Sequence, residues 1–157
     1  LSDALFEASL APLGMPLAAD VVHPADFPVS ATTTRVPVVH GHMVDLSVAL
    51  ESTVDPEAAA DTLRAFAPHL GLPSLPSPPL HVTDDPTRPQ PRLDRDRGEG
   101  MTVTVGRIRS CRVHDLRLMV LAHNLERGAA GAAVANAELC ALRGWIPGVD
   151  SVREGAA

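Results

Sequence analysis

Arg35 and His42 have side chains suited to binding a carboxylate and moving a proton. They stand seven positions apart, and Gly41 directly precedes the histidine. An arginine can bind a carboxylate through two hydrogen bonds, and a histidine near a tight turn can give or take a proton near neutral pH. The alternative interpretation is an ordinary surface charge and a histidine without a catalytic role, since the chain has seven histidines.

Arg107 and Arg109 form a second group, at alternate positions of the stretch Val-Gly-Arg-Ile-Arg. Alternate side chains of a strand share one face of the sheet. The spacing therefore permits an anion site or a salt bridge between subunits. A solvated strand face explains the same spacing without any ligand.

A third group opens the last predicted helix. His123 and Asn124 precede Glu126, and residues 128–132 are all glycine or alanine. Asn124 is the predicted N-cap, with Glu126 in the first turn. Close packing of a helix explains the small residues, and a helix start that presents its amides and Asn124 to a polar ligand explains them equally well.

A sheet and helices must hold these residues in place. Stretches rich in β-branched or alternating apolar residues predict strands at 29–39, 43–52, 80–83, 101–109 and 116–122. Helices are predicted at 1–13, at 56–70 behind the N-cap Asp55, and from Asn124 to about Leu142. Residues 84–100 are polar and are expected to form a long loop that is functional or mobile. Strands that follow strands favour an α+β domain with a mixed or antiparallel sheet.

Length and composition limit the possibilities further. The 157 residues predict an N-terminal helix and loop (1–28), one domain (29–148) and a frayed tail (149–157). All 13 basic residues are arginines and tyrosine is absent, which excludes a Schiff-base lysine, a P-loop lysine and a tyrosine acid. The net charge of -6 argues against nucleic acid as a partner. Cys111 and Cys140 are expected to be reduced thiols of a cytoplasmic protein without a metal site.

Neither a membrane span nor a signal peptide is expected. The chain has no run of about 18 apolar residues and no charged segment followed by an apolar one at its start. It begins at Leu1 rather than Met, which we expect of a truncated chain.

Four motifs occur in a particular order along the chain. They are Arg-Val-Pro-Val-x-x-Gly-His, Asp-Asp-Pro with Pro-Gln-Pro, Val-Gly-Arg-Ile-Arg, and Asn-Leu-x-Arg-Gly-Ala-Ala. This series resembles the C-terminal half of bacterial aspartate-semialdehyde dehydrogenase, over about residues 29–142. The resemblance implies the catalytic and dimerisation domain of that family, a mixed and mostly antiparallel sheet backed by helices.

The resemblance also implies an activity and roles for three residues. The family reduces aspartyl phosphate to aspartate semialdehyde with NADPH, through a cysteine thioester, and supplies lysine, threonine and methionine biosynthesis. Arg35 coincides with its arginine that binds the substrate carboxylate, and His42 with its acid–base histidine. Asn124 coincides with the asparagine at the start of the last helix, near the nicotinamide. A homodimer, a small carboxylate substrate and NADP are therefore the implied partners and cofactor.

Four departures separate the chain from the family pattern. It has no Gly-rich nucleotide loop, neither cysteine follows an asparagine as the family's nucleophile does, and residues 1–10 have no lysine for the substrate phosphate. His123 stands where the family usually has aspartate. We therefore expect the chain alone to dimerise but to be inactive as a dehydrogenase. The alternative is a stand-alone, non-redox relative that is a dimeric scaffold or a small acid–base catalyst on a carboxylate ligand.

Overall fold

The computed structural model describes residues 27–67 and 70–146. The chain divides into two compact units, Leu1–Pro37 and Val38–Ala157. No helix or strand occurs from residue 27 through residue 41, so the strand predicted at 29–39 is wrong. The segment has no strand to pair with in the described part of the chain, and Pro37 has no N–H to offer a partner. The helix predicted at 1–13 and the frayed tail at 149–157 lie outside the described residues.

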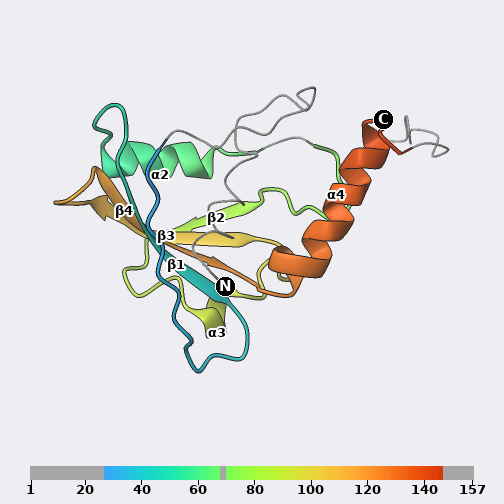
Figure 1. Cartoon of the computed structure of the whole chain (residues 1–157), viewed down its shortest axis with the longest axis horizontal. Helices are drawn as coiled ribbons and strands as arrows, with labels where there is room; N and C mark the ends of the chain where they lie inside the picture. Colours follow the sequence, from blue (N-terminus) through green and yellow to red (C-terminus); the bar gives the residue numbers. More distant parts are fainter. Residues whose placement is uncertain (1–26, 68–69, 147–157) are drawn as a thin grey trace. The chain divides into compact units, whose positions relative to one another are not determined.

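Four strands form one mixed sheet in the second unit (Figure 1). They are β1 (His42–Val48), β2 (Leu80–Thr83), β3 (Val103–Ser110) and β4 (Leu116–Ala122), in the order β1-β4-β3-β2. The β1–β4 and β3–β4 pairs are antiparallel, and β2 runs parallel to β3. The predicted fold class, a mixed and mostly antiparallel sheet with helices, is confirmed.

Helix α2 (Pro56–Arg64) begins where the sequence predicts and ends earlier. The carboxylate of Asp55 accepts hydrogen bonds from the backbone N–H groups of Glu57 and Ala58. The helix ends with Ala65 as its C-cap rather than continuing to Leu70. Pro68 explains the early end, because proline supplies no helical N–H and disfavours the helical conformation of the residue before it. In Figure 1, α2 lies over one face of the sheet, where it contacts β2 and β3.

Residues 84–100 form an organised connection rather than an open loop. It contains the short helix α3 (Pro91–Asp94) and is built around the carboxylate of Asp94, which is 1% exposed. That carboxylate accepts hydrogen bonds from Nε of Arg88 at 2.9 Å, from the N–H of Gln90 at 2.8 Å and from Nε of Arg97 at 3.1 Å. The buried charge therefore ties three points of the segment together.

The last helix has two parts, a π-helical turn η1 (Glu126–Ala130) and α4 (Gly131–Leu142). In η1 the N–H of Gly128 donates to the carbonyl of His123, five residues back, over 2.9 Å. A Cβ at Gly131 would lie 2.3 Å from Sδ of Met101, so a side chain has no room there. Close packing of the small residues is thus observed at Gly131.

The core lies mainly on β3 and β4. Its fully buried side chains include Thr104 and Leu121, and Val105 is 3% exposed. Edge strand β1 is largely exposed along its length. No helix of the described residues is long and apolar enough to cross a membrane.

Candidate functional site

Two of the three predicted site residues lie at the same end of the sheet. His42 is the first residue of β1, and its partner in the antiparallel register is Ala122, the last residue of β4. Asn124 follows two residues beyond that pair. Residues 82 positions apart in the sequence are therefore brought together because β1 and β4 run in opposite directions.

Gly41 makes the direct connection between the two segments. Its N–H donates a hydrogen bond to Oδ1 of Asn124 over 3.0 Å. Its φ of +120° is a conformation that other residues rarely adopt, and a Cβ would lie 3.2 Å from Cδ1 of Leu121 and from Cβ of Pro91. Since Oδ1 of Asn124 is the acceptor, the amide nitrogen Nδ2 is the end left to donate to a ligand.

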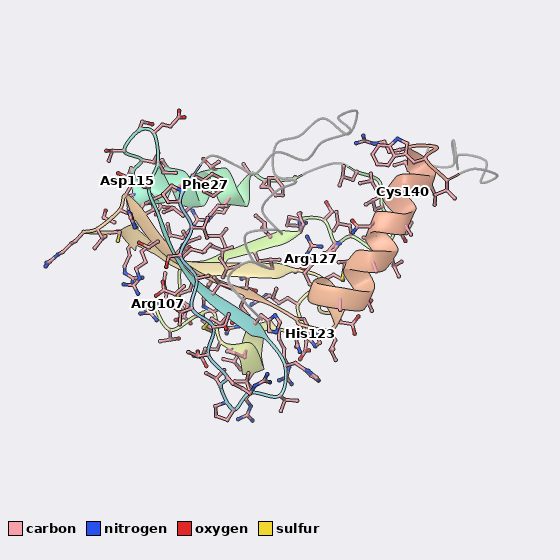
Figure 2. All side chains as sticks on the ribbon, viewed as in Figure 1. Phe27, Arg107, Asp115, His123, Arg127 and Cys140 are labelled. Atoms are coloured by element: carbon pink, nitrogen blue, oxygen red, sulfur yellow. The ribbon has the colours of Figure 1, made fainter. Side chains whose placement is uncertain are left out.

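His123, not Asn124, is the capping side chain at the start of the last helix. Its Nδ1 accepts the N–H groups of Leu125 at 3.2 Å and of Glu126 at 3.1 Å. The N-cap of the helix is Leu125, so the predicted N-cap Asn124 is wrong, and Asn124 turns its side-chain oxygen to Gly41 instead. Figure 2 labels His123 where β4 passes into the helix.

His40 completes this cluster. Its ring centroid lies 5.0 Å from that of His123, with the planes tilted by 36°. Nδ1 of His40 is buried and has no hydrogen-bond partner in the described part of the chain. On the other side of the pair, Nε2 of His123 lies 4.0 Å from Oδ1 of Asp96. The paired motifs His-Gly-His and His-Asn are the sequence signal for this cluster, but nothing in the sequence sets their distance.

His42 and Arg35 are both exposed. His42 stands at the open edge of the sheet, where a ligand has access to its ring. Arg35 belongs to the first unit and lies outside any helix or strand. Its meeting with His42 therefore stays a prediction.

The strand that carries Arg107 and Arg109 is irregular, and both side chains are exposed. The register of β3 against β4 shifts between Gly106 and Arg109, and Arg107 has a φ of +55°. A Cβ at Gly106 would lie 2.7 Å from the carbonyl oxygen of Arg88, so the 84–100 segment presses on the strand at the irregularity. Such a bulge breaks the alternation of side chains.

Asp45 and Arg117 form an ion pair across the exposed surface of β1 and β4. Nε of Arg117 lies 3.0 Å and 3.1 Å from the two carboxylate oxygens of Asp45. The hydrogen bond from Arg117, helped by the charges of Arg117, Arg109 and Arg107, holds the pKa of Asp45 below its ordinary value. Arg117 is thereby neutralised by its own partner.

Cys111 lies at the far end of β1 from His42. Its Sγ is 3.2 Å from Oγ of Ser47, five residues along β1 from His42, which corresponds to about 17 Å of strand. The hydrogen bond with Ser47, joined by the backbone of His114 and Val113, lowers the pKa of the thiol to about 7. Both cysteines are free, and Cys140 lies on α4 (Figure 2). Cys111 is therefore too distant to exchange a proton directly with His42.

The comparisons with known proteins agree on one family. A family model described as semialdehyde dehydrogenase, dimerisation domain, matches residues 16–127. Aspartate-semialdehyde dehydrogenase of Archaeoglobus fulgidus is 48% identical over 115 residues, which is 73% of this chain and 33% of the relative. The enzyme of the same name from Methanothermobacter thermautotrophicus is 47% identical over 124 residues, covering 76% of this chain and 36% of the relative.

A solved structure shows the same likeness. The crystal structure of aspartate semialdehyde dehydrogenase with NADP from Candida albicans matches with a TM-score of 0.65 and 41% identity. The match covers 71% of this chain and 33% of that structure. The chain thus spans about a third of the length of the relatives it matches.

Proposed function

The chain belongs to the semialdehyde dehydrogenase family, and because it matches that family's dimerisation domain, we propose that it provides the catalytic and dimerisation part of an aspartate-semialdehyde dehydrogenase. The reaction proposed is the NADPH-dependent reduction of aspartyl phosphate to aspartate semialdehyde. That reaction belongs to the biosynthesis of lysine, threonine and methionine, and a cytoplasmic location goes with it.

The hydrogen bond from Gly41 to Asn124 carries this proposal. It joins the segment before His42 to the start of the last helix, so the two side chains assigned to acid–base chemistry and to the nicotinamide share one end of the sheet.

In the proposed reaction the side chains have separate tasks. The imidazole of His42 takes the proton of a thiol as its sulfur bonds to the acyl carbon and phosphate leaves. It gives the proton back to the sulfur when the carbon–sulfur bond breaks and the aldehyde departs. The guanidinium of Arg35 holds the substrate carboxylate through two hydrogen bonds, which fixes the substrate's orientation. An exposed imidazole on a strand end is accessible to a substrate in this way.

The donor set at Asn124 fits the proposed cofactor. Its Nδ2 is fixed as a donor by the bond that Gly41 makes to Oδ1, and a carboxamide oxygen such as that of nicotinamide is a suitable acceptor. When bound, NADPH supplies the hydride for the reduction. The 157 residues contain no Gly-rich phosphate loop, so the phosphates of the cofactor need residues outside the motifs found here.

A homodimer is the proposed assembly. The edge strand β1 exposes apolar side chains, including Met43 at 39% and Val44 at 41%. Exposed apolar residues on an unpaired edge favour burial against another chain.

Ligand binding tests the proposal on the chain itself. We expect calorimetry to detect binding of a small dicarboxylate such as succinate, and Arg35→Ala to abolish it. Arg92→Ala, which removes an exposed arginine of the second unit instead, is the control and should leave binding unchanged. Binding that survives Arg35→Ala would contradict the role given to Arg35.

The second candidate is a stand-alone relative without redox chemistry. The distance between Cys111 and His42 favours it, because Cys111 lies too far from the proposed base to be the nucleophile that it activates. Carboxylate binding together with no NADPH-linked turnover, even after addition of the nucleotide-binding part of a relative, would support this second candidate over the first.

A further inference from the structure

We propose that His123, in contact with His40, is a positioning residue that holds the segment His40-Gly41-His42 against the start of the last helix and so sets the place of His42. The inference rests on the proposed function, in which His42 is the acid–base residue. His123 does not touch a substrate in this account. It acts through the two residues that precede His42.

His123 accepts hydrogen bonds from two backbone N–H groups at the start of the last helix. Nδ1 can accept the N–H groups of Leu125 and Glu126 only while it carries no proton, so the ring proton is on Nε2. Nδ1 is attached to Cγ, the same position that the side-chain oxygen of a capping asparagine occupies. Because His123 satisfies these backbone groups, the amide of Asn124 is released for Gly41.

Two consecutive residues, His40 and Gly41, contact the start of the last helix. The ring of His40 lies 5.0 Å from the ring of His123, and the N–H of Gly41 is bonded to Asn124. Two neighbouring residues of one segment are thus held by two neighbouring residues of another. A single contact would allow the segment to rotate, whereas two contacts fix both its position and its direction into β1.

The ring of His123 is enclosed by its neighbours. His123 is 6% exposed, and a Cβ at Gly100 would lie 3.4 Å from its Cγ. Asp96 lies 4.0 Å from Nε2, and His40 covers another side of the ring. A ring enclosed in this way cannot turn without displacing its neighbours, so it is a rigid support.

Amide hydrogen exchange measured by NMR on the 157-residue chain, without any ligand, tests the inference. We compare His123→Ala, His123→Asn and the control His114→Ala, which removes an exposed histidine of the β3–β4 turn. His123→Ala should speed exchange at Gly41 and His42 by about tenfold or more while Val105 in β3 stays protected. His123→Asn restores an acceptor for the helix start and should recover at least half of that protection on a logarithmic scale.

Three results would overturn the inference. Equal acceleration at Gly41 and Val105 in His123→Ala would mean that the residue serves overall stability alone, and the inference would be overturned. Unchanged exchange at Gly41 would overturn it too, as would a His123→Asn variant that recovers no protection. Because no substrate is present, these outcomes do not depend on the dicarboxylate test, and failure of the proposed function leaves them measurable.

Discussion

Cys111 should be the more reactive of the two thiols that the structure describes. Its pKa of about 7, lowered first by the hydrogen bond with Ser47, gives a substantial thiolate fraction at neutral pH. We expect alkylation by iodoacetamide to rise through pH 7 and to exceed that of Cys140. Ser47→Ala should raise the pKa and slow labelling at pH 7, as mass spectrometry of the labelled peptides would reveal.

A matched variant separates this effect from general loosening of the fold. Thr87→Ala removes a hydroxyl that lies on the 84–100 segment and makes no contact with Cys111. If Thr87→Ala slowed labelling as much as Ser47→Ala does, the hydrogen bond with Ser47 would not be the cause.

Asp94 should be the most important carboxylate for the stability of the 84–100 segment. Burial opposes its charge, but hydrogen bonds from Arg88, Gln90 and Arg97 outweigh burial and keep its pKa below the ordinary value. A lowered pKa in the folded state stabilises the fold above the pKa of the unfolded chain, about 3.9. That stabilisation is lost as the pH falls through the folded-state value.

We therefore expect Asp94→Ala to reduce the free energy of unfolding by about 3 kcal/mol at pH 7, because it leaves two arginines without their buried partner. Below pH 4 the variant and the natural chain should approach each other in urea denaturation. Asp96→Ala is the control, since that carboxylate is 71% exposed, and its effect should stay within about 0.5 kcal/mol. A cost for Asp94→Ala that is the same at pH 3 and pH 7 would contradict the role of its charge.

Residue-level roles could be predicted from the sequence only where a single segment decides them. Asp55 was predictable as a cap because the acceptor and the two N–H groups lie within three residues. The cap at the last helix was not, because the side chain of Asn124 finds its partner in Gly41, 83 residues away. The spacing of residues along the sequence does not show whether a side chain will bond to its own helix start or to a distant segment.

At the scale of elements, we expect Gly131 to be the residue that lets the last helix pack closely against Met101. A Cβ there would lie 2.3 Å from Sδ of Met101 and 2.9 Å from the backbone oxygen of Glu126. The methionine end can move, but the backbone oxygen must shift. We expect Gly131→Ala to lower stability by about 1–2 kcal/mol, even after the gain in helix propensity.

Gly128→Ala is the comparison, because the nearest atom to its added Cβ is the carbonyl oxygen of His123 at 3.3 Å. In thermal unfolding, the free energy of unfolding of Gly128→Ala should exceed that of Gly131→Ala by at least about 1 kcal/mol. If the order were reversed, the contact with Met101 would not be what restricts the position.

The elements themselves were predictable where periodicity continues without interruption. The apolar run of residues 116–122 coincides with β4, and the cap Asp55 with Pro56 marks the start of α2. The irregular parts were not predictable. The bulge at Arg107 lies beside Gly106, which packs closely against Arg88 of the 84–100 segment. The strand at 29–39 would need a partner that the described residues do not supply.

At the scale of the whole molecule, the chain should dimerise and yet lack dehydrogenase activity. Sedimentation velocity at micromolar concentration should report twice the mass of one chain, and NADPH consumption with aspartyl phosphate should not exceed the blank. Replacing an exposed apolar residue of the edge strand, Val44→Asp, should shift the population toward monomer without unfolding. Turnover by the purified chain would contradict the need for a further domain.

His42 is exposed to solvent, which limits how well the proposed site can shield a reactive acyl group from water. A thioester formed beside an exposed imidazole would meet bulk water, and the same base that helps a thiol to attack would also activate a water molecule. Hydrolysis would then compete with reduction. If the proposed reaction takes place here, we expect hydrolysis of the thioester to increase whenever the first residues of β1 stay exposed to water.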